Sequence, residues 1–149
     1  MINVDVWNVL HDGELIAADG SVPGELKLSV GIAYLCVHLP TDAAHVIITL
    51  SGCDRFEYQP YRDPRVSNPS AVAAMRLQFL SAEVADGAVS VECADGGYGG
   101  QLALQYLSAS AATAEGRPLS QSELECAAER YWSLWEQMHS NQNDTFEPR

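Results

Sequence analysis

The stretch that decides the fold is S-Q-S-E-L-E-C-A-A-E-R-Y-W-S-L-W-E-Q-M-H, residues 120–139. Apolar residues recur in it at the period of an α-helix, which predicts one helix with an apolar and a polar face. The apolar face holds Leu124, Ala127, Ala128, Tyr131, Leu134, Trp135 and Met138, with Trp132 at its edge. Because two of the chain's three tryptophans lie there, we expect this face to cover the core of a sheet. On that interpretation, Trp135→Ala would destabilise the protein by about 3–5 kcal/mol.

The helix has a clear start signal in the sequence. The Ser120 hydroxyl can accept a hydrogen bond from the amide of Glu123, and the Glu123 carboxylate can accept one from the amide of Ser120, which is a capping box. Polar residues follow the helix, so residues 141–149 are predicted to form a flexible C-terminal tail. Residues 1–140 are expected to form a single domain, long enough to bury a core.

The residues before the helix contain several runs that alternate between apolar and polar side chains, as antiparallel strands do. The clearest run is 25–32, and further predicted strands are 14–18, 46–51, 56–58, 76–84, 89–93 and 102–106. Residues 2–10 begin with alternation and precede Asp12-Gly13, which predicts a hairpin with the strand 14–18. Residues 33–39 are predicted to stay extended, and residues 108–117 to be a loose connector.

These elements add up to about seven to nine strands in hairpin order, followed by one long helix. Strands and helices do not alternate, so a parallel α/β sheet is not expected. The predicted fold class is α+β: a mostly antiparallel, curved or rolled β-sheet covered by one long C-terminal α-helix.

The chain is strongly acidic. Twenty Asp and Glu residues against eight Lys and Arg give a formal net charge of −12 at pH 7. This balance argues against binding to nucleic acid or to an anionic membrane surface. No apolar run approaches the roughly 20 residues of a membrane span, and the N-terminus lacks the pattern of a secretory signal. We therefore expect a cytoplasmic protein.

The cysteines give no sign of a metal or redox site. Cys36, Cys53, Cys93 and Cys126 are widely spaced, which favours reduced thiols over a disulfide framework. Cys126 differs from the others because it lies on the polar face of the predicted helix. Cys36 and His38 would share one face of an extended segment, but no second ligand pair stands near them. No metal, cofactor or catalytic residue is predicted.

One segment contrasts with the acidic chain: C-D-R-F-E-Y-Q-P-Y-R-D-P-R, residues 53–65. It combines guanidinium groups with aromatic surface, a pairing that is enriched at interface hot spots. The predicted binding site consists of Arg55, Tyr58, Tyr61, Arg62 and Arg65. The alternative is structural, with the arginines pairing with Glu57, Asp63 and the acidic body to close a surface loop.

Two hypotheses on function remain open. The first is a non-catalytic binding or interaction protein of the bacterial cytoplasm, whose acidic surface engages a protein partner. An immunity protein that blocks a basic toxin surface is one concrete form of it. The second is a rolled sheet that holds a small anionic or apolar ligand in its mouth, with or without enzymatic turnover. Homodimerisation is a further possibility, and cross-linking through Cys126 would test it.

Overall fold

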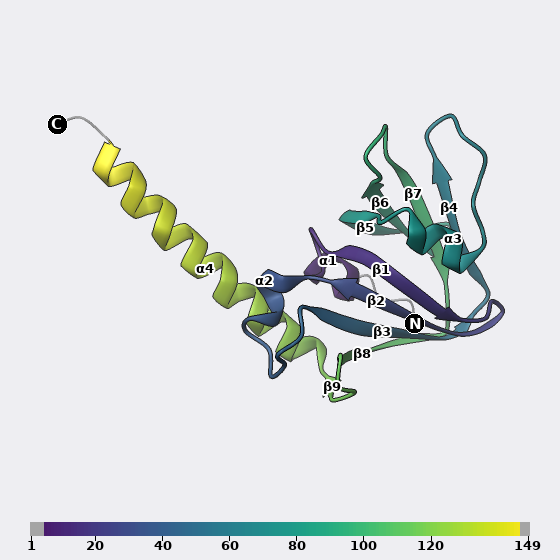
Figure 1. The fold of residues 1–149 in the computed structure, drawn as a ribbon, viewed down its shortest axis with the longest axis horizontal. Helices are drawn as coiled ribbons and strands as arrows, with labels where there is room; N and C mark the ends of the chain where they lie inside the picture. Colours follow the sequence, from purple (N-terminus) through teal and green to yellow (C-terminus); the bar gives the residue numbers. More distant parts are fainter. Residues whose placement is uncertain (1–4, 147–149) are drawn as a thin grey trace.

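The computed structural model describes the backbone of residues 5–146 and the side chains of residues 5–139. Within this range the fold is α+β, as predicted: an open antiparallel sheet of nine strands and a long C-terminal helix, α4 (Gln121–Phe146). Figure 1 shows the sheet as the body of the molecule and α4 as an arm that leaves it. The fold class is therefore confirmed, and the position of the helix is the feature to explain.

The sheet runs in the order β4-β7-β6-β5-β1-β2-β3-β8-β9. Its strands are β1 (Glu14–Gly20), β2 (Gly24–Gly31), β3 (His45–Cys53), β4 (Arg55–Pro60), β5 (Gln78–Ala85), β6 (Ala88–Ala94), β7 (Gly100–Gln105), β8 (Ser108–Thr113) and β9 (Pro118–Leu119). In residues 5–120, three short helices precede α4, and they are α1 (Asp5–Val9), α2 (Ala33–Cys36) and α3 (Pro69–Ala74). The predicted strands from residue 14 to residue 106 are confirmed, apart from shifts at their ends.

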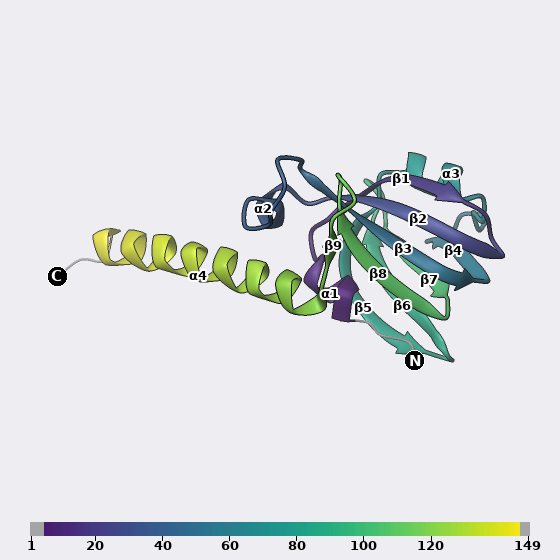
Figure 2. The same cartoon turned by 90° about the horizontal axis from the view of Figure 1, so that it is seen from below.

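The sheet is bent into two halves that share one core. Between β1 and β5 the ladder consists of a single pair, Glu14 with Gln78. At the opposite corner the chain passes from β3 to β4 through Asp54, whose amide donates to the carbonyl of Gln105 at 2.9 Å. Gly52, at a φ of 62°, lies at this corner in the left-handed region that favours glycine. The two groups of strands thus turn their apolar faces toward each other (Figure 1, Figure 2).

Helix α1 completes the core that the two halves enclose. Trp7 is only 1% exposed, and its ring packs edge-to-face on Phe79 with 5.7 Å between centroids. Its Nε1 donates a hydrogen bond to the hydroxyl of Tyr106 at 3.0 Å. The predicted strand over residues 2–10 and its hairpin are wrong for residues 5–10, and residues 2–4 lie outside the described residues. Val6, Trp7 and Leu10 share one helical face and fill the core from it.

Two more segments differ from their predicted conformation. Residues 33–36 form α2, because Ile32, Leu35 and Leu39 recur at helical spacing and all three are buried. Residues 37–39 continue as a turn and a bend, not as a strand. Residues 108–117 contain β8, which pairs with β3 along its whole length from Ser108 to Thr113. Alanine is depleted in strands, so the small side chains gave no strand signal, and the ladder with β3 holds this segment extended.

Helix α4 begins as predicted and then leaves the body. The amide of Glu123 donates to the Ser120 hydroxyl at 3.1 Å, and the amide of Ser120 donates to the Glu123 carboxylate at 3.1 Å. Leu124 and Ala127 are buried in the first turns. The helix continues to Phe146, past the predicted start of the tail at residue 141, and residues 147–149 lie outside the described residues.

The apolar face of α4 is covered only near its start. Beyond the first turns, Trp132 is 40% exposed, Leu134 51%, Trp135 42% and Met138 65%. The prediction that this whole face packs on the sheet is therefore wrong. The two halves of the sheet and Trp7 already fill the core, so the second half of α4 has no apolar surface to cover.

Candidate functional site

The predicted arginine and tyrosine site lies on β4 and the loop that follows it. The loop folds back onto β4, because the amide of Val66 donates to the carbonyl of Tyr58 and the amide of Tyr58 donates to the carbonyl of Val66, both at 2.8 Å. The side chain of Tyr58 points into the core, is fully buried, and donates its hydroxyl proton to Asp95 at 2.9 Å. Tyr58 therefore supports the fold and offers no binding surface.

Arg55 and Arg65 follow the structural alternative. The Nε of Arg55 lies 2.6 Å from a Glu57 oxygen, and a terminal nitrogen of Arg65 lies 3.6 Å from the same oxygen. Glu57 thus bridges two arginines across the outer face of β4. Because these groups are exposed, the ion pairs contribute little to stability, and they leave both guanidinium groups already partnered.

Tyr61 and Arg62 form the exposed part of the predicted site. The Arg62 guanidinium lies 5.1 Å from the centre of the Tyr61 ring, and Tyr61 in turn contacts Tyr98 edge-to-face with 5.9 Å between centroids. Tyr98 belongs to the turn between β6 and β7, so the structure brings two distant segments together. Sequence reasoning missed Tyr98, because a tyrosine among glycines has no partner that its spacing reveals.

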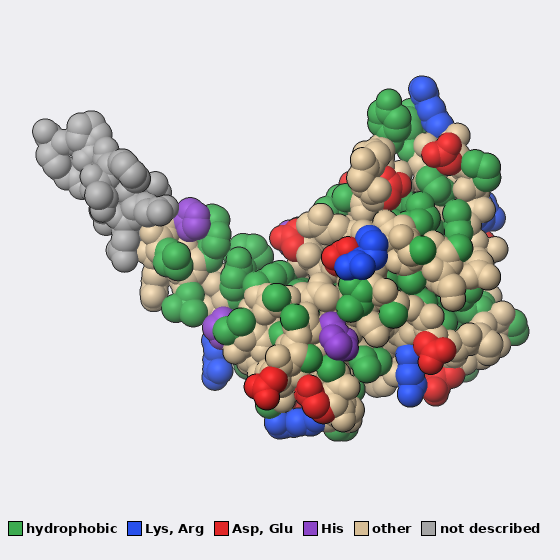
Figure 3. All heavy atoms as spheres, in the orientation of Figure 1, with side chains coloured by type: hydrophobic (Ala, Val, Ile, Leu, Met, Phe, Trp, Pro, Cys, Tyr) green, Lys and Arg blue, Asp and Glu red, His purple; other side chains and the backbone are tan. Residues whose placement is uncertain are grey.

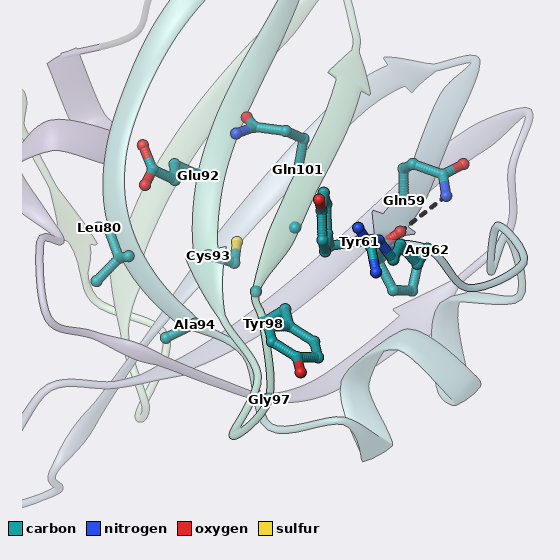
Figure 4. A pocket seen from close by; sticks show the side chains of 13 residues that line it. Gln59, Tyr61, Arg62, Leu80, Glu92, Cys93, Ala94, Gly97, Tyr98 and Gln101 are labelled. Carbon is teal, nitrogen blue, oxygen red and sulfur yellow. Dashed lines mark hydrogen bonds between the residues drawn. The ribbon is translucent and has the colours of Figure 1, made fainter.

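These residues border a cleft of about 520 Å³ (Figure 4). Glu92 and Cys93 contribute to its lining from β6, and Gln101 from β7. Burial raises the pKa of the Cys93 thiol to about 12, so the thiol is protonated at neutral pH. The cleft thus combines one cation, one carboxylate and aromatic edges, and the thiol in its lining is not an activated nucleophile.

The cysteines are free thiols, as the sequence predicts, but Cys36 lies in α2 and not in an extended segment. All four are free thiols; Cys36 and Cys53 are buried with Cys93, and Cys126 is exposed on α4. Burial raises the pKa of Cys36 to about 11. Burial also raises the pKa of Cys53 above its ordinary value, so both thiols stay protonated near neutrality. Within the described part of the chain, no group of three or more His, Cys, Asp and Glu side chains is arranged to hold a metal ion.

A second candidate surface lies on α4, where aromatic rings form a continuous ladder. Tyr34 of α2 packs against Tyr131 with 4.4 Å between centroids, and Tyr131 contacts Trp132 at 5.0 Å. Trp132 lies 6.0 Å from Trp135, whose ring stacks on His139 at 3.6 Å. In Figure 3, hydrophobic side chains gather along α4 where it leaves the body. The ladder thus begins on the folded body and extends along the free part of the helix.

A groove of about 560 Å³ runs between α1 and the same part of α4. Its apolar lining consists of Val9, Ala128 and Trp132. Carboxylates surround this lining, and they are Asp5, Glu125, Glu129 and Glu136. The helical period puts these glutamates on the side opposite most of the apolar face, but the sequence could not show that α1 would complete a groove beside them.

None of the helices in the described residues is both long enough and apolar enough to cross a membrane. No protein-family model, no curated protein and no solved structure matches this chain.

Proposed function

We propose that this chain is a non-catalytic interaction protein that binds a protein partner through the outer half of α4. The observation that carries the proposal is the apolar stripe of Leu134, Trp135 and Met138. The stripe lies where α4 extends from the body, and all three side chains are exposed. Large exposed apolar patches mark interaction surfaces, and tryptophan is enriched among the residues that dominate binding energy. In the bacterial cytoplasm, an immunity protein that blocks a toxin is one concrete form of this function.

The length of α4 supports this proposal. At about 1.5 Å per residue, its 26 residues span about 39 Å, and the part beyond Tyr131 extends roughly 20 Å from the body. An isolated helix of that size is only marginally stable in water, since tertiary packing supplies most helical stability in proteins. A partner that covers the stripe would provide that packing.

The state of the thiols favours binding over covalent catalysis. Nucleophilic cysteines need a lowered pKa, whereas burial raises the pKa of Cys36, Cys53 and Cys93. Cys126 is exposed on the polar side of α4, away from the apolar stripe.

The test is a double substitution, Leu134→Glu with Met138→Glu, compared with Cys126→Glu and Gln137→Glu on the polar face of the same helix. Both variants gain two carboxylates, so only the apolar stripe distinguishes them. We expect wild type and the polar-face variant to co-purify with the same partner from the native host, and the stripe variant to lose it. All three should unfold at similar temperatures. Equal recovery of the partner with the stripe variant would contradict the proposal.

A second candidate function is the binding of a small anionic ligand in the cleft beside Arg62. The Arg62 guanidinium over Tyr61, next to Tyr98, favours it, because cations and aromatic edges can together hold a planar anion. A panel of carboxylates and phosphates should then raise the melting temperature of wild type and of Arg117→Ala, but not of Arg62→Ala. Equal shifts in all three proteins would show that the anions do not bind at Arg62.

A further inference from the structure

The groove between α1 and α4 gives a more specific description of the partner. Three of its carboxylates come from α4 at positions 125, 129 and 136, and Trp132 lies between them in the sequence. Steps of four, three and four residues keep these side chains on one stripe of a helix. A carboxylate row therefore runs parallel to the apolar lining of the groove, and Asp5 adds a fourth carboxylate from α1.

In this groove, the charge of the three α4 glutamates is not balanced within the described residues. No Lys or Arg lines it, and its one histidine, His11, lies 3.4 Å from Asp12, which is a further carboxylate. Glu125 accepts a hydrogen bond from Gln121 at 3.1 Å, which is a neutral donor. None of the ion pairs among the described residues involves Glu129 or Glu136.

We infer that this groove receives a basic amphipathic helix of the partner protein. The inference rests on the proposed function, because it assumes that α4 is the binding element. An apolar side chain of the incoming helix would lie on Val9, Ala128 and Trp132. Lysines or arginines at spacings of three and four residues would reach the carboxylate row. An arginine can also pack on the exposed Trp132 ring, which adds a cation–π contact.

Charge complementarity selects this occupant over a second copy of the chain. Each copy carries a net charge of −12, so a dimer through this groove would bring more carboxylates to a row that already lacks cations. An anionic lipid surface is disfavoured for the same reason. A basic segment neutralises the row and covers the apolar lining in one step.

The experiment uses the full chain and three synthetic peptides of about 18 residues. The first is an amphipathic helix of leucine with lysine and arginine, the second replaces its basic residues with glutamate, and the third scrambles the first so that no apolar face remains. Calorimetry and tryptophan fluorescence measure binding. We expect only the first peptide to bind with a defined stoichiometry of one, and its affinity to fall as the salt concentration rises.

Matched variants locate the binding. Glu129→Gln with Glu136→Gln should lower the affinity for the first peptide by about tenfold or more, since two charge contacts are lost. Glu25→Gln with Glu83→Gln removes the same number of charges from exposed positions on β2 and β5, and should change the affinity by less than about twofold. If both double variants lost the same affinity for the first peptide, net charge alone would explain the loss, and the inference would be overturned.

The remaining outcomes separate this inference from the proposed function. Equal binding of the acidic or scrambled peptide, or no binding of the basic one, would overturn the basic-helix inference. The co-purification test on the Leu134→Glu, Met138→Glu variant would still decide the proposed function. A dimer of the wild-type chain in sedimentation, converted to a monomer by Trp132→Glu within the groove, would identify a second copy as the occupant and would also overturn the inference.

Discussion

At the scale of residues, the tryptophans divide into one that holds the core and two that lie on the surface of α4. Trp7 is buried against Phe79 and Tyr106, whereas Trp132 and Trp135 contact mainly other residues of the helix and each other. The same residue type thus serves the fold at one position and is available to a partner at the others.

We expect Trp7→Ala to destabilise the protein by about 3–5 kcal/mol, because it removes a large buried ring and the hydrogen-bond donor to Tyr106. Trp135→Ala should cost less than about 1 kcal/mol, below the value of about 3–5 kcal/mol expected from the sequence, because its side chain is 42% exposed and lies outside the core. Denaturant unfolding of the two variants measures both values. A larger loss for Trp135→Ala than for Trp7→Ala would contradict the assignment of the core.

The lowered pKa of Asp95 in the folded protein makes its stability depend on pH. Its carboxylate accepts hydrogen bonds from the amide of Gly97 at 2.9 Å and from the hydroxyl of Tyr58 at 2.9 Å, and these contacts lower its pKa. A lowered pKa in the folded state adds stability above the unfolded value of about 4, and this contribution is lost as the pH falls through the folded pKa.

The free energy of unfolding of Asp95→Asn should therefore lie below that of wild type at pH 7, and the difference should shrink as the pH falls below about 4. Tyr58→Phe, which removes one donor and keeps the amides, should show a smaller change of the same sign. Denaturant titrations at several pH values measure this. A difference that stays constant down to pH 2 would show that Asp95 titrates alike in both states.

At the scale of elements, α4 depends on its capping box more than a fully packed helix would. Among the described residues, the body contacts mainly the first half of α4, where Tyr34 packs against Tyr131 and Trp132, so the reciprocal bonds between Ser120 and Glu123 fix where the helix starts. Ser120→Ala should lower the free energy of unfolding by about 1 kcal/mol, while Ser120→Asp should retain most of it. Equal stability of Ser120→Ala and wild type would mean that packing of Leu124 alone sets the start.

The elements also show which sequence patterns were sufficient. The run 25–32 could be predicted because eight residues of strict alternation fit a strand and no other element. Residues 5–10 and 33–36 could not, because four to six residues with mixed apolar positions fit a short helix as well as a strand. β8 was missed because its stability comes from pairing with β3, which is distant in sequence.

At the scale of the whole molecule, the candidate site was only partly predictable. The sequence identified Tyr61 and Arg62, and the structure adds Tyr98 from another turn. It placed Arg55 and Arg65 in the same site, and the structure shows that both pair with Glu57. The groove beside α4 needed α1, whose helical conformation the sequence did not reveal.

The contrast between body and arm should be visible in native-state hydrogen exchange. Amides of β2 and β3, at the centre of one half of the sheet, should exchange only on global unfolding. Amides of residues 132–139 should exchange much faster, because the exposed stripe provides few buried contacts, and partner binding should slow them. Equal protection of both regions in the free protein would contradict the view that α4 extends without support.

The sequence alone determined the α+β class, the central strands, the start of α4, the acidic charge and the free thiols, because each depends on local periodicity, capping or composition. Only the tertiary structure decided what the apolar face of α4 meets. Periodicity shows which residues share a face, but not whether another surface lies opposite it. The two halves of the sheet close on each other around Trp7, so much of the tryptophan face of α4 is left exposed.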